Sequence, residues 1–116
     1  MAKTYIEDDA GDLRQIFEED VLTWPHVTSR RMFGCPAYIA NGALFALLVT
    51  RGIVLTHLSE VEREALSCVA VVQPFKAGSK TVHRWAQVNI RSIDEIEAVL
   101  PYVHISYQSA LAQATE

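Results

Sequence analysis

The 116 residues suffice for one domain, placed over residues 1–116, and half of them are hydrophobic, so the core needs no disulfide or metal. A net charge of −4 argues against a general coat for nucleic acid. No apolar run approaches the about 20 residues that span a bilayer, and the first residues lack the apolar stretch of a signal peptide. We therefore expect a cytoplasmic chain with no membrane contact and with reduced cysteines.

Charge is segregated along the chain. Residues 1–20 hold seven acids and two bases, residues 21–91 hold eight bases and three acids, and the remainder holds four acids and no base. Blocks of like charge commonly form solvated faces. A basic central region can also face an anionic partner. The sequence leaves both interpretations open.

The first predicted element is an amphipathic helix over residues 8–24. Its apolar residues recur at steps of three and four and form one stripe, made of Leu13, Ile16, Phe17, Val21 and Trp24. Pro25 ends the helix, because the residue before a proline avoids the helical conformation.

Three strand signals follow this helix. Residues 37–40 and 43–49 flank Asn41-Gly42, which favours a two-residue hairpin turn because both turn residues need a positive φ. Residues 43–49 are apolar throughout, so this strand is either central and covered on both faces or lies at a subunit interface. Residues 53–57 are the third strand.

A capping box at Ser59 and Glu62 predicts a second helix over residues 60–69, in which Cys68 packs as a small buried hydrophobe. Residues 75–90 then predict a hairpin around residues 76–80. On its second strand one face carries Val82, Arg84, Ala86, Val88 and Ile90, and the other carries His83, Trp85, Gln87 and Asn89.

The last predicted element is a helix over residues 92–112. Pro101 lies inside its apolar stripe and predicts a kink, or a division into two short helices. The resulting order is α-β-β-β-α-β-β-α. Tight hairpins separated by single helices indicate the α+β class, with an antiparallel sheet packed by helices.

Residues 30–34, Arg-Arg-Met-Phe-Gly, form an Arg-x-Met-Phe-Gly box directly before a hairpin. This box resembles the opening of the TfoX N-terminal domain family. The resemblance continues through the Asn-Gly hairpin, the apolar strand, Pro74-Phe75 with its basic loop, and residues 100–107. It covers roughly residues 10–112.

The resemblance implies a compact, secretion-chaperone-like α+β domain that is often dimeric. The TfoX proteins that act as competence regulators help to switch on DNA-uptake genes together with the cyclic-AMP receptor protein. Those regulators carry a second, C-terminal domain, and this chain also departs from the family at Cys35-Pro36, where another small, flexible residue is usual.

The sequence contains no recognisable catalytic or metal-binding pattern. The four histidines, His26, His57, His83 and His104, lack paired spacing, and no C-x-x-C motif occurs. We therefore expect no enzyme activity, no metal and no cofactor. A nucleophilic Cys35 paired with a distant histidine is the competing interpretation.

Two groups of residues are candidates for binding a partner or an anion. Arg30 and Arg31 lie beside the Met-Phe-Gly box, and Lys76, Lys80, His83, Arg84 and Trp85 lie in the second hairpin. Basic residues around an exposed aromatic ring suit contacts to phosphates and bases. Alternatively, the lysines are solvated hairpin tips, Trp85 is buried under a helix or at a dimer contact, and the arginines pair with the acidic helices. Met32 and Phe33 are expected to pack in or near the core.

Two functional hypotheses follow. The first is a non-enzymatic regulatory module that contacts proteins such as a transcription factor or RNA polymerase, and that forms a homodimer through the apolar strand. Direct contact with nucleic acid stays open under it. The second is a small-molecule or anion-binding domain with a pocket lined by Arg30, Arg31 and Cys35.

Overall fold

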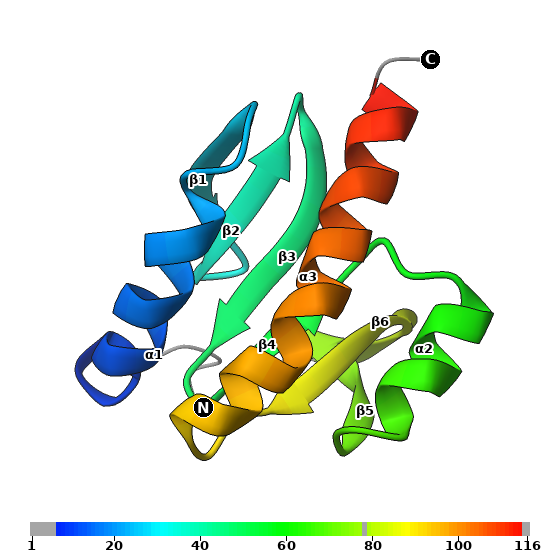
Figure 1. Cartoon of the computed structure of the whole chain (residues 1–116). Coiled ribbons are helices and arrows are strands. Elements are labelled where there is room, and N and C mark those ends of the chain that lie inside the picture. Colours follow the sequence, from blue (N-terminus) through cyan, green and yellow to red (C-terminus); the bar gives the residue numbers. More distant parts are fainter. Residues whose placement is uncertain (1–6, 78, 115–116) are drawn as a thin grey trace.

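The computed structural model describes residues 7–77 and 79–114 (Figure 1). Over these residues the chain forms α1 (Glu7–Val21), β1 (Val27–Met32), β2 (Cys35–Ala40), β3 (Ala43–Val49), β4 (Gly52–Leu55), α2 (Glu60–Ser67), β5 (Val72–Ala77), β6 (Lys80–Asn89) and α3 (Ile93–Ala114). The predicted α+β class with an antiparallel sheet is confirmed. The order contains one strand more than predicted, because β1 precedes the Asn-Gly hairpin.

The described strands form one antiparallel sheet in the order β1-β2-β3-β4-β6-β5. This order puts β3 in the interior, with most of its side chains buried. Of the two alternatives for this strand, the structure shows the central one. A homodimer through β3 is therefore wrong, because one copy of the chain already covers that strand.

Two tight turns connect the first three strands. Asn41 and Gly42 have φ values of 48° and 87°, and Phe33 and Gly34 have φ values of 55° and 74°. Two positive φ values in succession are typical of the type I′ turn that matches the twist of paired strands. The predicted Asn-Gly turn is confirmed, and Phe33-Gly34 is a second turn of the same kind.

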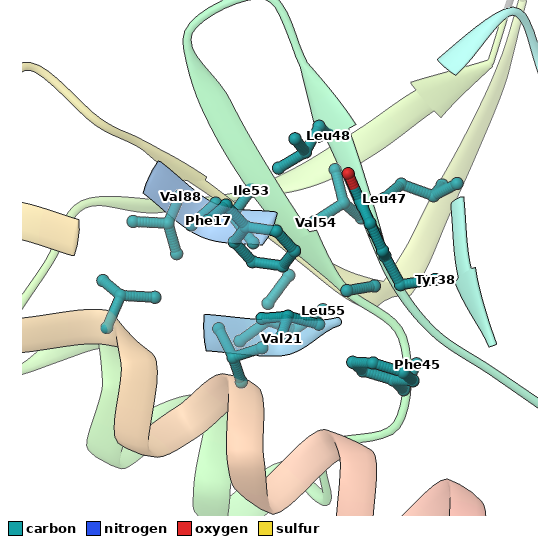
Figure 2. Packing of buried hydrophobic residues seen from close by; sticks show 14 of the residues in the cluster. Phe17, Val21, Tyr38, Phe45, Leu47, Leu48, Ile53, Val54, Leu55 and Val88 are labelled. Carbon is teal, nitrogen blue, oxygen red and sulfur yellow. The ribbon is translucent and has the colours of Figure 1, made fainter. Parts of the chain in front are cut away.

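Helices α1 and α3 cover one face of the sheet (Figure 1). Figure 2 shows Phe17 and Val21 of α1 among the side chains of β2, β3 and β4, and the Phe17 ring lies 4.9 Å from that of Tyr38. Trp24 follows the end of α1 and lies 5.0 Å from Tyr107 of α3. The apolar stripe predicted for the first helix thus packs against the core as expected.

Helix α3 runs unbroken through Pro101, so the alternative of two short helices is wrong. It is attached to the sheet by buried Ser106. The Ser106 hydroxyl donates a 2.7 Å hydrogen bond to the Phe45 carbonyl and accepts a 3.1 Å bond from the His57 amide. Neither α3 nor any other described helix combines the length and apolarity that crossing a bilayer requires.

Helix α2 begins with the predicted capping box, in which Ser59 and Glu62 exchange hydrogen bonds with each other's backbone amides. The prediction that Cys68 is buried is wrong, because Cys68 is exposed at the end of the helix. Val61, Ala65 and Cys68 recur at helical steps and are expected to form the apolar stripe of this helix, but all three face solvent. Leu66 is the residue of α2 that enters the core.

Candidate functional site

The predicted binding residues lie on strands at opposite ends of the sheet. Arg30 and Arg31 are exposed on β1, whereas Lys76 of β5 and Lys80, His83 and Arg84 of β6 are exposed at the far end. Trp85 is half-buried, so neither the exposed nor the buried alternative describes it fully. Strand order alone would keep these two groups apart.

An aromatic cluster, formed by Phe33, Phe75 and Trp85, connects the two ends. The Phe33 ring centroid lies 6.1 Å from that of Phe75 and 6.0 Å from that of Trp85, and the latter two are 5.6 Å apart. Tilted rings at such separations attract one another beyond the area they bury. The cluster brings the Met-Phe-Gly box against the basic hairpin.

This contact requires a strongly curled sheet, because Phe33 follows one edge strand, β1, and Phe75 lies in the other, β5. The curl also explains why Ala37, Leu47 and Val54 are fully buried. Strand alternation directs these three side chains away from the helices, whose face is marked by Tyr38. The curled edges cover them instead.

Phe33 combines exposure with backbone strain. Its side chain is 54% exposed, so the prediction that it packs in or near the core is wrong, although Met32 beside it does pack against the core. Its φ of 55° lies in the left-handed region, which a bulky residue rarely adopts. Such strain is concentrated at functional sites in known proteins.

A bulge in β6 places the hairpin's site residues. Pro74 lies opposite Ala86, but Phe75 lies opposite Val82, so residues 83–85 are extra on the β6 side. The bulge interrupts the strict alternation that the sequence predicts. Arg63 of α2 fixes it from outside, donating hydrogen bonds to the carbonyls of Leu58 at 2.7 Å and Arg84 at 3.4 Å.

The prediction of ion pairs between Arg30 or Arg31 and the acidic helices is wrong within the described residues. Arg31 instead donates a 3.2 Å hydrogen bond to the Gly34 carbonyl. Glu18 of α1 is already engaged by Arg14 at 3.1 Å and by the Tyr38 hydroxyl at 2.6 Å. Both arginines of β1 therefore present their charge to solvent or to a partner.

Cys35 does not line an accessible pocket. It is fully buried at the start of β2, and its thiol lies 3.6 Å from the Phe33 carbonyl. Burial raises the pKa of this thiol above its ordinary value, and the positive charge of Arg31 only partly opposes the effect. A nucleophilic cysteine needs the reverse shift. Cys35 therefore does not contribute a thiol to the hypothetical pocket lined by Arg30, Arg31 and Cys35.

Two of the four histidines have structural surroundings. His104 packs edge-on against Trp24 at 4.9 Å, and the Nδ1 atom of His57 lies 3.4 Å from the Ser109 hydroxyl. In the described part of the chain, no three side chains of His, Cys, Asp or Glu gather as metal ligands would.

A shallow hollow of about 400 Å³ lies beside the aromatic cluster, between α2 and the β5–β6 hairpin. Its lining includes two predicted residues, His83 and Trp85, together with Glu60 and Glu64 of α2. A second hollow, of about 290 Å³, lies near the start of α3, and its lining contains none of the predicted residues. The mixed charge of the first hollow does not suit a small anion.

Sequence reasoning missed three parts of this site. The sequence predicts Phe33 in or near the core, and it marks neither Phe75 nor Arg63 as a binding residue. The available signal was Phe33-Gly34 between two short segments, which has the spacing of a two-residue turn.

Comparisons with protein-family models, curated proteins and solved structures found no match for this chain.

Proposed function

We propose that this chain is a non-enzymatic, cytoplasmic regulatory module that binds an acidic partner protein through the aromatic cluster and the basic side chains around it. The partner belongs to a transcription complex, as the resemblance to TfoX N-terminal domains implies. The same resemblance supports a homodimer, whose interface lies outside the buried strand β3.

One observation carries this proposal. The contact of Phe33 with Phe75 and Trp85 joins two basic segments that the strand order would separate. The result is an exposed aromatic ring with Arg30, Arg31, Lys76, Lys80 and Arg84 exposed on the strands around it. Aromatic rings and arginines are enriched among the residues that dominate protein interfaces.

A protein partner suits the surface better than nucleic acid. The net charge of −4 weakens the long-range attraction to phosphates that supplies most non-specific affinity. Glu60 and Glu64 also line the hollow beside Trp85. A partner with a limited acidic patch can avoid these carboxylates, whereas a continuous phosphate backbone meets them more readily.

The test is affinity capture from a lysate of the native cells, comparing three forms of the chain. These are the wild type, Lys80→Glu/Arg84→Glu, and the matched control Arg51→Glu/Arg91→Glu. The control makes the same charge change at two exposed arginines away from the cluster. Thermal unfolding of each form checks that the fold is retained.

Capture of a transcription protein by the wild type and the control, but not by Lys80→Glu/Arg84→Glu, is the expected result. Equal loss in both double variants would show that only net charge matters. Equal capture by all three forms would reject this surface as the binding site.

A further inference from the structure

Strand β1 is exposed on both faces and along its outer edge. Four consecutive residues, 28–31, are exposed, although side chains of a strand alternate between its two faces. Among the described strands, β1 pairs only with β2, and no ladder joins it to β5, the strand that its end approaches through Phe33. An open edge of this kind is a template for another strand.

The pattern of backbone hydrogen bonds identifies which groups point outward. The Asn41 amide bonds the His26 carbonyl at 3.2 Å, in the register that pairs Arg30 with Ala37. Antiparallel ladders alternate, so residues 28, 30 and 32 bond to β2, and residues 29 and 31 direct their amides and carbonyls outward. The described chain gives these outward groups of Ser29 and Arg31 no partner.

The charge and shape of the β1 edge indicate which kind of segment can bind beside it. Arg30 and Arg31 project to opposite faces of β1, and neither pairs with a described carboxylate. An extended segment beside β1 would therefore meet a guanidinium above and below the sheet. Phe33, directly after β1, offers an exposed apolar contact at one end.

We propose that the outer edge of β1 binds an extended acidic segment of a partner protein as an additional strand of the sheet. This inference rests on the proposed function and specifies how the partner binds. Main-chain hydrogen bonds to Ser29 and Arg31 supply affinity, and carboxylates opposite Arg30 and Arg31 supply specificity.

The other edge and a second copy of the chain fit this role less well. Strand β5 contains Pro74, which has no amide hydrogen to donate. Pairing β1 with the β1 of a second copy would bring four arginines and no carboxylate into one short ribbon. Like charges close together across strands are destabilising.

Backbone-methylated peptides test the proposal on the wild-type protein. The probe is an acetylated, amidated peptide of repeating Thr-Thr-Glu-Glu, which carries glutamates on both faces of an extended strand. It is used in three forms: unmethylated, N-methylated at every second residue, and N-methylated at every residue. Methylation of every second residue leaves one edge of the peptide strand able to pair with β1, whereas methylation of every residue blocks both edges. Binding is followed by amide NMR shifts, with a threonine–lysine peptide as the charge control.

The expected result is shifts centred on Ser29, Arg31 and Phe33. The fully methylated peptide should bind at least about tenfold more weakly, and the half-methylated peptide should bind nearly as well as the unmethylated one. Equal binding by the fully methylated and unmethylated peptides, shifts centred elsewhere, or no binding up to about millimolar peptide would overturn strand addition. The lysine peptide should not bind.

Ser29→Pro provides the corresponding change in the protein. It removes an outward amide and leaves the β1–β2 ladder intact, since proline is tolerated at the free edge of a sheet. We expect about tenfold weaker peptide binding for Ser29→Pro and unchanged binding for the control Ser29→Ala. If Ser29→Pro impairs folding, the methylated peptides still decide. The peptide experiments can reject strand addition, whereas the capture experiment can reject the proposed function. The two failures are therefore distinguishable.

Discussion

Phe33 occupies a turn position where glycine, asparagine or aspartate would relieve the backbone. A left-handed conformation costs an ordinary residue about 1–2 kcal/mol, and asparagine tolerates it best among residues with side chains. The ring contacts of Phe33 with Phe75 and Trp85 offset part of this free-energy cost. The rest is consistent with a side chain retained for binding rather than for stability.

Two substitutions separate the strain from the ring contacts. Phe33→Asn and Phe33→Ala both remove the ring, but only asparagine suits the left-handed turn. We therefore expect Phe33→Asn to be more stable than Phe33→Ala by about 1 kcal/mol in denaturant unfolding. Asn41→Ala, at the equivalent turn position, should lose a similar amount relative to the wild type. Equal stability of the two Phe33 variants would show that the turn is not strained.

The two cysteines should differ sharply in reactivity. Cys68 is exposed, whereas Cys35 is buried and burial raises the pKa of its thiol. With a thiol-reactive dye at neutral pH, we expect Cys68 to react at a rate near that of free cysteine, and Cys35 to react only after unfolding. The single variants Cys35→Ala and Cys68→Ala assign each phase. Rapid labelling in Cys68→Ala would revive the hypothesis of an activated Cys35.

At the scale of elements, one buried hydroxyl holds α3 to the sheet. Ser106→Ala leaves the His57 amide without its partner, whereas the Phe45 carbonyl keeps the 3.2 Å bond from the Thr56 amide. An unsatisfied buried group costs about 1–3 kcal/mol, so we expect a loss of that order in the free energy of unfolding. Ser109→Ala, one turn along the same helix at an exposed position, should change it little. Equal effects would show that solvent satisfies the His57 amide in Ser106→Ala.

Local patterns predicted most of the elements but not β1. Periodicity identified the stripe of α1, and Asn41-Gly42 identified the first hairpin turn, because both signals depend on near neighbours in sequence. The exposed residues of β1 show no apolar alternation, since neither face of that strand is covered. For α2, the chosen stripe was the wrong one, because the burial of Leu66 is set by distant parts of the chain.

At the scale of the whole molecule, the curl of the sheet determines the candidate site. The sequence identified the basic residues of both segments, yet it could not indicate that they adjoin, since Phe33 and Phe75 are 42 positions apart by their numbering and meet only in the folded chain. The bulge at residues 83–85 is a second tertiary effect that strand alternation could not predict.

The proposed subunit arrangement also belongs to this scale, and it rests on the resemblance to TfoX N-terminal domains. We propose a homodimer, so light scattering at micromolar protein should give twice the mass of one chain. Because β3 is buried within one copy, Leu47→Val should lower stability without changing the mass. A single-chain mass for the wild type would reject the homodimer.

Site-specific photo-crosslinking in the native cells tests the central claim, that a partner protein binds at the aromatic cluster. Phe33→p-benzoylphenylalanine places the reactive group in the cluster, and Ile93→p-benzoylphenylalanine places it at another exposed apolar residue, at the start of α3. We predict a discrete protein adduct from position 33, lost when Lys80→Glu/Arg84→Glu is added, and none from position 93. Adducts from position 93 alone, or from neither position, would contradict the claim.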